Sequence, residues 1–556
     1  MSPTDGPAGR PSGNVLIVGA GPTGLLLAGD LAAAGVACTV LERRDAETSA
    51  LTRAFAVHAR TLELLDARGV ADRLVATGRR VGRVRLAGVA RLRFDRLPGR
   101  FPYVLVTPQY ETERVLRERA LDRGAEILYG AEAVGLRQDA AGVDVDVRMA
   151  AGGTRTLRAS YVVGADGVRS TVRDAVGLPF PGEAVLRSLM LADVRLENAP
   201  DEAFTAGASA DAFAFVAPFG DGWYRVGAWN RRHQAPDTEP VDVGELREVV
   251  RRALGTDLGL GEPRWTSRFH SEERQVPRYR VGRVFLAGDA AHVHSPAGGQ
   301  GMNVGLQDAA NLGWKLAAAL RGRAPSWLLD SYHEERYPVG RAVLRGSGAL
   351  LRGVTAEPRA LRLARDAAVW TATRIPPVAR RLAGAASGVD LAYPAPRDAH
   401  PLTGRRAPDV PLAGAPGRLY GLLGDGRFVL VVAANDPAVT YLATKRWADR
   451  VHCAVAGRAT RTTALVRPDG YIAWACDETA PDLRAAAIRA ALGHWCGPPA
   501  ERPPHERRRH GPSGRPDAER PATGSPATGS SATERPATGR SAPERPVAER
   551  RGPDTV

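Results

Sequence analysis

Two glycine-rich segments, far apart in the chain, suit the binding of a long phosphate-containing cofactor. The first, Gly19-Ala-Gly-Pro-Thr-Gly24, directly follows an apolar run and has G-x-G-x-x-G spacing. In this pattern the first glycine allows a tight turn, the second lets backbone N–H groups approach a pyrophosphate, and the third lets a helix pack closely on a strand. Glu42 ends the next apolar run, where a carboxylate can bond ribose hydroxyls. This segment predicts a dinucleotide site.

The second segment joins an apolar run, a carboxylate and another glycine-rich turn. Asp289 follows Val284–Ala287, and Pro296-Ala-Gly-Gly-Gln-Gly301 then precedes a helical pattern that starts near Asn303. A carboxylate at a strand end lies where α/β sheets bind ligands, and it suits the hydroxyls of a ribityl chain. The helix N-terminus would stabilise negative charge on a reduced flavin. Because an NAD dehydrogenase needs no second site of this kind, the two segments together predict FAD.

The elements that must position these segments have the pattern of a βαβ unit. Asn14–Val18 and Ala37–Leu41 have the apolar composition of buried parallel strands, and Pro22–Gly35 between them has the pattern of a helix. Tyr161–Ala165 is a further buried strand. This alternation predicts an α/β fold with a Rossmann-like parallel sheet.

Residues 176–280 differ in texture, with aromatic side chains and partly alternating runs. They predict an antiparallel sheet inserted into the α/β domain. Core packing accounts for the aromatic residues, and the alternative is that one face of the sheet forms the wall of a site for a flat aromatic ligand. The candidates for lining that wall are Phe213, Phe215, Trp223 and Arg225.

The chain divides further by composition. The expected parts are a flexible arm at 1–13, an FAD-binding domain at 14–175 and 281–393, a substrate-binding sheet domain at 176–280, a linker with a compact third domain at 394–497, and a tail at 498–556. The tail has no Phe, Trp or Tyr, so it cannot bury enough apolar surface to fold. It is predicted to be disordered.

Composition limits the partners. Among 556 residues the net charge is +15, but of 76 basic residues only Lys315 and Lys445 are lysines, so 74 are arginines, and they are spread along the chain. A nucleic-acid footprint needs basic residues on one face, so none is predicted. The four cysteines lack C-x-x-C spacing, which argues against a metal site or a disulfide scaffold. No apolar run is long enough to span a membrane, and a cytoplasmic protein is expected.

Three segments resemble the motifs of the class A FAD-dependent aromatic monooxygenases. They are Gly19–Gly24, Gly164-Ala-Asp-Gly-Val-Arg-Ser170 and Leu286-Ala-Gly-Asp-Ala-Ala-His292. Pro296–Leu320 is similar to the phenol-hydroxylase branch, while Arg406–Val410 and Arg467–Gly470 resemble its thioredoxin-like C-terminal domain. The overall likeness is to hydroxylases of aromatic polyketides and to rifampicin monooxygenases. Without C-x-x-C, thiol–disulfide chemistry is not expected in the C-terminal domain.

The resemblance implies a reaction and a set of cofactor contacts. NADPH or NADH would reduce FAD, O₂ would add to give C4a-hydroperoxyflavin, and a polycyclic aromatic, polyketide-type substrate would be hydroxylated. Glu42 and Arg43 would hold the adenosine, Arg53 and Gln109 the ribityl or phosphate region, Val134 the adenine, and Asp166 belongs to a motif associated with FAD and NADPH. The full implied set is Gly19, Gly21, Thr23, Gly24, Glu42, Arg43, Arg53, Gln109, Val134, Asp166, Asp289, Pro296, Gly299, Met302 and Asn303.

Some alternatives stay open at this point. A Baeyer–Villiger oxygenase or a rifamycin-inactivating monooxygenase of the same family fits the same motifs, and a non-enzymatic flavoprotein is a more remote possibility. Because the flavin performs the chemistry, no catalytic acid or base is named. His292 and His294 are expected to serve local structure. The oligomeric state, the exact substrate and the position oxygenated are not fixed by the sequence.

Overall fold

The computed structural model describes residues 13–46, 54–86, 90–200, 204–295, 298–354, 359–414, 416–433, 439, 445–458 and 460–499. Arg53 and Pro296 lie outside the described residues. So do the expected arm, except for Gly13, and the expected tail, except for its first two residues.

A mostly parallel six-stranded sheet forms the centre of the first domain. Its order is β18-β19-β12-β1-β2-β8. The pair β18–β19 is antiparallel, and the other neighbours are parallel. The expected βαβ unit is confirmed, since β1 and β2 are buried parallel neighbours. The strands are β18 (Arg280–Val281), β19 (Val284–Leu286), β12 (Tyr161–Gly164), β1 (Asn14–Val18), β2 (Ala37–Glu42) and β8 (Glu126–Tyr129).

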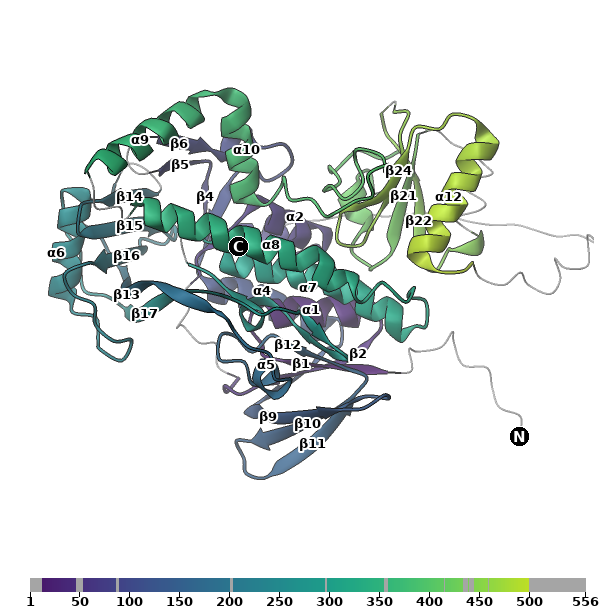
Figure 1. Ribbon diagram of the computed structural model, residues 1–556, viewed down its shortest axis with the longest axis horizontal. Coiled ribbons are helices and arrows are strands. Elements are labelled where there is room, and N and C mark those ends of the chain that lie inside the picture. Colours follow the sequence, from purple (N-terminus) through teal and green to yellow (C-terminus); the bar gives the residue numbers. More distant parts are fainter. Residues whose placement is uncertain are drawn as a thin grey trace, which may run out of the picture. The chain divides into compact units, whose positions relative to one another are not determined.

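Helices α1 (Pro22–Ala33) and α7 (Gly301–Leu320) pack along each other beside this sheet (Figure 1). Small residues allow the close approach: a Cβ on Gly305 would lie 2.4 Å from Thr23 Oγ1, and one on Gly313 would lie 3.2 Å from Asp30 Cβ. α4 (Gln109–Asp122) packs on α1, and α8 (Ser331–Val354) contacts α7. The sequence thereby brings its two glycine-rich segments to neighbouring helices.

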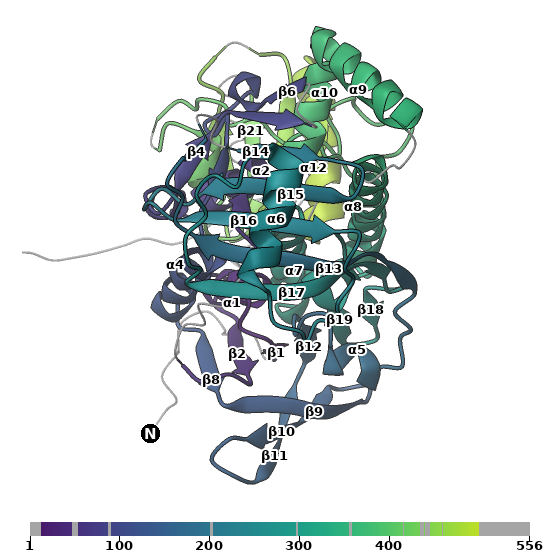
Figure 2. The same ribbon diagram turned by 90° about the vertical axis from the view of Figure 1, so that its left-hand side faces the viewer.

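The second sheet is antiparallel, with order β14-β15-β16-β13-β17-β20. Figure 2 shows α6 (Val243–Leu254) lying across one of its faces. The expected inserted sheet is confirmed, although β20 lies beyond the expected limit at residue 280. The strands are β13 (Gly182–Val194), β14 (Thr205–Ala208), β15 (Ala212–Pro218), β16 (Tyr224–Asn230), β17 (Trp265–Gln275) and β20 (His292–Val293).

Smaller elements surround these two sheets. One three-stranded sheet has the order β11-β10-β9, another has the order β3-β7-β4, and β5 and β6 form a two-stranded sheet. Their bounds are β3 (Ala56–Val57), β4 (Arg79–Val81), β5 (Arg83–Leu86), β6 (Ala90–Arg93), β7 (Val104–Val106), β9 (Ala131–Gln138), β10 (Val143–Met149) and β11 (Thr154–Ala159). The remaining helices of this part are α2 (Ala59–Ala67), α3 (Ala71–Val75), η1 (Phe94–Arg96), α5 (Thr171–Ala175), η2 (Gly288–Ala290), α9 (Arg359–Arg374) and α10 (Pro376–Ser387).

The third part of the fold, here called the C-terminal domain, comprises the described residues from 394 onward. It contains a mixed four-stranded sheet of order β22-β21-β23-β24, in which β21 and β22 are parallel. The bounds are η3 (Leu419–Leu422), β21 (Phe428–Val432), β22 (Val451–Val455), β23 (Thr463–Val466), β24 (Ile472–Cys476) and α12 (Pro481–Cys496).

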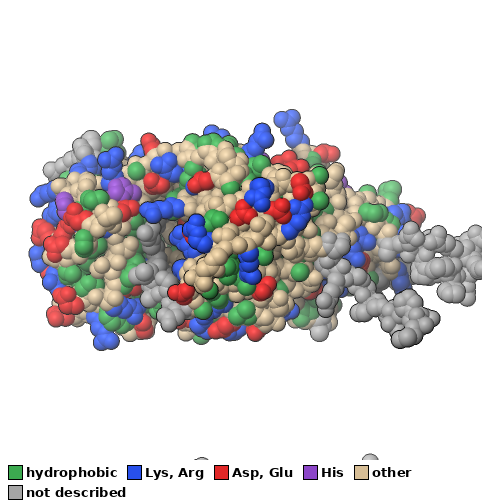
Figure 3. All heavy atoms as spheres, turned by 90° about the horizontal axis from the view of Figure 1, so that it is seen from below, with side chains coloured by type: hydrophobic (Ala, Val, Ile, Leu, Met, Phe, Trp, Pro, Cys, Tyr) green, Lys and Arg blue, Asp and Glu red, His purple; other side chains and the backbone are tan. Residues whose placement is uncertain are grey.

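Basic and acidic side chains are interspersed on the face seen from below (Figure 3). Many arginines are paired, as in Arg137–Asp146 at 2.7 Å and Arg158–Asp139 at 2.7 Å. Within the described ranges, no helix combines the length and apolarity needed to cross a membrane. The described residues also contain no His, Cys, Asp or Glu group arranged to hold a metal ion, and all four cysteines are free thiols.

Candidate active site

The first glycine-rich segment, called here the early cradle (Gly19–Gly24), is shaped by backbone contacts. Gly19 has φ +105°, and a Cβ there would lie 2.4 Å from the Ala165 carbonyl oxygen. A Cβ on Gly24 would lie 2.0 Å from the Gly19 oxygen. Gly21, in contrast, has no atom within 4 Å of where its Cβ would be, and no described side chain caps α1 there. The helix therefore presents bare N–H groups to an open space, which fits an anionic phosphate.

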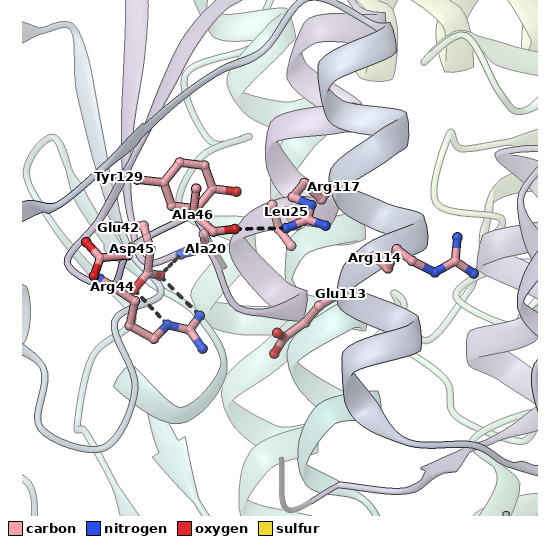
Figure 4. A pocket seen from close by; sticks show the side chains of 10 residues that line it. All are labelled: Ala20, Leu25, Glu42, Arg44, Asp45, Ala46, Glu113, Arg114, Arg117 and Tyr129. Atoms are coloured by element: carbon pink, nitrogen blue, oxygen red, sulfur yellow. Dashed lines mark hydrogen bonds and ion pairs between the residues drawn. The ribbon is translucent and has the colours of Figure 1, made fainter. Parts of the chain in front are cut away.

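A pocket lies beside the early cradle at the end of β2 (Figure 4). Glu42, 5% exposed, accepts hydrogen bonds from the Ala20 N–H at 2.8 Å and from Arg44 Nε at 2.9 Å. Burial alone would raise the pKa of Glu42, but the bonds from Arg44 and Ala20 outweigh it and lower the pKa. The carboxylate is therefore ionised at neutral pH and can accept from hydroxyl groups. The lining residues are Ala20, Leu25, Glu42, Arg44, Asp45, Ala46, Glu113, Arg114, Arg117 and Tyr129.

Two expected contacts of this region lie outside the pocket lining. Arg43 is exposed, and its neighbour Arg44 lines the pocket instead. Val134 lies on β9 with 37% exposure, and Tyr129 at the end of β8 lines the pocket. The sequence held no signal for Tyr129, because its place depends on β8 pairing with β2.

The second segment, called here the late cradle, comprises residues 288–295 and 298–303, and it contacts the early cradle directly. Asp289 lies exposed in η2, just after β19. Gly288 has φ +59°, and a Cβ there would lie 2.7 Å from Thr23 Oγ1. Two segments far apart in the sequence are therefore in contact at Thr23. This contact allows a single long ligand to reach both of them.

The start of α7 is fixed by Asn303, which is completely buried. Its Oδ1 accepts from the His58 N–H at 2.9 Å, and its Nδ2 donates to the Ala56 and Gly299 carbonyls at 2.9 and 2.7 Å. Because the side chain is used inside the protein, a ligand at this helix end would meet the backbone N–H groups, including those of Met302 and Asn303. Gly299, at φ +64°, packs so closely that a Cβ would lie 2.9 Å from Ala56 Cβ.

A buried carboxylate that the sequence analysis missed accepts hydrogen bonds from two residues of the late cradle. Asp308, 0% exposed, accepts from the Gly288 N–H at 3.1 Å, His292 Nε2 at 2.6 Å and Arg336 Nε at 2.7 Å. Burial raises its pKa, but Arg336 and His292 outweigh burial and lower it. No motif marks Asp308, whose partners come from three different elements.

Two further predicted residues have structural contacts. Gln109 Oε1 accepts from the Ala54 N–H at 3.2 Å, beside the undescribed segment that holds Arg53. Asp166 accepts from Ser170 Oγ at 2.6 Å and from the Val172 N–H at 3.1 Å, so it fixes the start of α5. Burial raises the pKa of Asp166. Its segment lies against Gly19, whose added Cβ would be 3.0 Å from Asp166 Cα.

The face of the second sheet opposite α6 carries a row of aromatic rings. The Phe215 ring stacks on Phe55 at 5.5 Å and on Phe204 at 5.8 Å between centroids, and Phe213 packs with the same cluster. A Cβ on Gly227 would lie 2.1 Å from the Phe215 ring. Phe55 directly precedes Ala56, whose carbonyl accepts from Asn303. The aromatic face therefore begins next to the late cradle.

The other two expected wall residues have different surroundings. Arg225, 0% exposed, pairs with Asp193 at 2.7 and 3.0 Å, and its guanidinium lies 4.6 Å from the Trp265 ring centre. Its charge is neutralised inside the sheet. Trp223 packs against the guanidinium groups of Arg195 and Arg264, whose Cζ atoms lie 5.2 and 4.4 Å from its ring centre.

Comparisons with known proteins agree with this geometry. Residues 13–347 match the model of an FAD-binding domain, and residues 400–499 match that of an aromatic-ring hydroxylase C-terminal region. The chain is 40% identical to a 12-dehydrotetracycline 5-monooxygenase/anhydrotetracycline 6-monooxygenase of Streptomyces rimosus, over 88% of this chain and 99% of that protein. It is 40% identical to a rifampicin monooxygenase of Streptomyces venezuelae, over 84% of this chain and 96% of that protein.

Among solved structures, an aromatic hydroxylase from angucycline biosynthesis superimposes with a TM-score of 0.77 and 40% identity. The match covers 88% of this chain and 100% of that one. The α/β fold, the two adjoining cradles and the matches over nearly the whole length of these relatives all lead to one assignment. The chain belongs to the FAD-dependent aromatic-ring monooxygenases.

Proposed function

We propose that this enzyme hydroxylates a polycyclic aromatic, polyketide-type substrate with O₂ and NAD(P)H. The observation that carries the proposal is the row Phe55, Phe215 and Phe204, which begins one residue from the Ala56 contact of the late cradle. A broad aromatic face suits a flat, fused-ring substrate better than a single phenol, because stacking area grows with ring number. The tetracycline and angucycline relatives support the same class.

The described residues of both cradles support the binding of FAD. The bare N–H groups at Gly21 would receive the pyrophosphate, the ionised Glu42 the adenosine ribose, and Asp289 the ribityl hydroxyls. Arg44 and Tyr129 join Glu42 in the proposed adenosine pocket. The roles of Arg43, Arg53, Gln109, Val134, Asp166 and Pro296 stay predictions.

When bound, FAD supplies the redox chemistry and the activation of O₂. The protein's own residues bind, orient and stabilise charge. The N-terminal N–H groups of α7 would stabilise negative charge on the reduced ring. The face with Phe213 and Phe215 would orient the substrate ring and exclude water. No described side chain is assigned a proton-transfer step.

The proposal includes the domain organisation expected from the sequence. The residues at 14–175 and 281–393 would form the FAD-binding domain, and those at 176–280 the substrate-binding domain. The mixed sheet of the C-terminal domain supports a thioredoxin-like fold, although it has no C-x-x-C.

The test is oxidation of a substrate panel under ¹⁸O₂ with NADPH or NADH. We expect an angucyclinone- or anthracyclinone-type compound to stimulate NAD(P)H oxidation and to gain one labelled oxygen on an aromatic carbon. Stimulation by simple phenols alone would refute the polycyclic class. A labelled lactone would instead establish a Baeyer–Villiger reaction on the same scaffold.

Rifamycin is the second candidate, because a rifampicin monooxygenase is 40% identical over 84% of this chain. It belongs in the same panel. Phe213→Ala should raise KM for a fused-ring substrate more than Trp223→Ala, because the Trp223 ring already packs against two arginine side chains. The reverse order would place the substrate at the Trp223 end of the sheet.

A further inference from the structure

The hairpin turn Arg467–Gly470 of the C-terminal domain is buried, although hairpin tips usually face solvent. It joins β23 to β24, with the Gly470 N–H donating to the Arg467 carbonyl at 2.8 Å and Gly470 at φ +76°. The Arg467 and Asp469 side chains are each 2% exposed and form an ion pair within the turn. The tip therefore carries two buried charges into the neighbouring part of the fold.

Both charges contact the helices of the FAD-binding domain. Arg467 Nη1 and Nη2 donate to the two carboxylate oxygens of Glu335 on α8, at 2.6 and 2.9 Å. Glu335 also accepts from Lys315 Nζ at 2.8 Å and from Asn311 Nδ2 at 2.6 Å, and both of these lie on α7. Asn311 reaches Asp469 as well, at 3.3 Å. Lys315 and Asn311 have no exposed surface.

The four charged members of this network balance as two cations and two anions. Burial lowers the pKa of Lys315 to about 8, so its ammonium stays largely charged at neutral pH beside Glu335. Removing one partner from such a group strands a buried charge, whereas apolar residues of similar size can often replace the whole group without loss of stability. Stability alone therefore does not account for the network. A directional set of charge-assisted bonds can instead fix one arrangement of the helices.

The same turn also holds α2. The Asp469 carbonyl accepts from Arg60 Nη2 at 2.6 Å, and Arg60 is 0% exposed. Arg60 also donates to the Tyr420 hydroxyl of the C-terminal domain at 3.0 Å. Two residues before Arg60, the His58 N–H donates to Asn303 at the start of α7.

One buried turn thus contacts both helices that begin at the late cradle. It holds α7 at Asn311, eight residues beyond Asn303 and about 12 Å along the helix. It holds α2 at Arg60. We propose that the Arg467–Gly470 turn is a positioning element of the FAD site, which fixes the position of the N-terminus of α7 relative to the flavin ring. This inference rests on the proposed function only in placing that ring at the N-terminus of α7.

The test compares FAD binding and flavin properties in matched variants of the full chain. Arg467→Met combined with Glu335→Gln removes one cation and one anion, so that Lys315 and Asp469 still balance. Arg467→Lys keeps the charge but loses the two-point contact with Glu335. Arg323→Met removes a half-exposed ion pair with Asp449 that joins the same two domains. Arg268→Met removes a buried arginine of β17 that pairs with Glu245 on α6.

For the double variant we expect a circular dichroism spectrum like that of wild type and FAD binding weaker on the order of tenfold. We also expect a shifted absorption spectrum and midpoint potential of the bound flavin, and more H₂O₂ released per NAD(P)H consumed. Arg467→Lys should lie between the double variant and wild type. The Arg323→Met and Arg268→Met variants should match wild type in FAD affinity, flavin absorption spectrum, midpoint potential and H₂O₂ release.

The inference is overturned if the double variant binds FAD with wild-type affinity, spectrum and potential. It is also overturned if Arg323→Met or Arg268→Met causes the same shifts, since any loosened contact would then suffice. A wild-type chain that takes up no FAD would instead refute the proposed function itself. The two failures are therefore distinguished by the wild-type titration alone.

Discussion

The early and late cradles would hold two parts of one cofactor, yet they are built in different ways. The early cradle is one continuous segment whose shape comes from glycine backbone and the close packing of β1 and α1. The late cradle is held by groups from elsewhere in the chain, among them the His58 N–H and the Asp308 carboxylate, which Arg336 supports in turn. The first depends on local geometry, and the second depends on tertiary contacts. Substitutions should therefore damage the two cradles in different ways.

The largest effect is expected for Gly24→Val in the early cradle. A Cβ there would lie 2.0 Å from the Gly19 oxygen, which is backbone and cannot move aside cheaply. We expect α1 to lose its packing on β1 and the protein to be recovered without FAD, as measured by flavin absorbance and circular dichroism.

Gly21→Ala is the matched control for that change. Gly21 has φ −75°, and no atom lies within 4 Å of the position that its Cβ would take. The variant apoprotein should therefore fold normally. The added methyl would instead meet the pyrophosphate and weaken FAD binding by about tenfold or more. Wild-type FAD affinity in Gly21→Ala would show that no phosphate approaches this backbone.

In the late cradle, Asp308→Ala should act through stability. It removes the acceptor for Gly288 and His292 and leaves the Arg336 guanidinium buried without its carboxylate. Loss of a buried charge partner costs about 3–5 kcal/mol, which urea unfolding of the apoprotein would measure. Combining it with Arg336→Met should recover part of that loss.

Glu42→Gln, beside the early cradle, should weaken FAD binding with a smaller loss of stability than Asp308→Ala. An equal loss of stability would remove the contrast between the two cradles.

The late cradle should also respond to acid through His58. Burial lowers the pKa of His58 from 6.5 to about 4, so the unfolded chain takes up a proton in that pH window and the folded chain does not. Neutral His58 therefore makes its full contribution to the free energy of unfolding above pH 6.5. That contribution is lost as the pH falls toward 4, by at most about 1.4 kcal/mol per pH unit. Unfolding free energies at pH 7 and pH 5 should differ less in His58→Gln than in wild type. His233→Gln is the control, because the His233 side chain is 50% exposed. An equal pH response in wild type and His58→Gln would contradict the assignment.

The smallest effect is expected from deleting residues 502–556, because neither cradle contains them. The deletion spares Pro498, whose carbonyl accepts from Arg450 Nη1 at 3.0 Å. FAD content and turnover should equal those of the full chain. A folded truncated protein with lower activity would give the tail a role in one of the cradles.

Much of the fold followed from the sequence because it depends on local patterns. The strands at Asn14–Val18 and Ala37–Glu42 and the start of α1 are set by apolar runs and glycine spacing that involve neighbouring residues only. The antiparallel character of the second sheet also followed from alternation within each strand. Thr23, Gly24 and Glu42 could be named for the same reason.

The contacts of Asp308, Arg467 and Tyr129 could not be predicted in this way, although Arg467 lies in a segment that the sequence singled out. Each acts through partners distant in sequence: Gly288 and Arg336 for Asp308, Glu335 for Arg467, and the β2–β8 pairing for Tyr129. Likewise, the sequence proposed both Phe213 and Arg225 for the wall of the substrate site. It could not show that Phe213 packs in the aromatic cluster while Arg225 is neutralised by Asp193. The sequence by itself determined the backbone of the early cradle, because glycine spacing acts over a few bonds. Only the tertiary structure decided which buried charges and rings face one another, because those contacts exist only after distant segments have packed together.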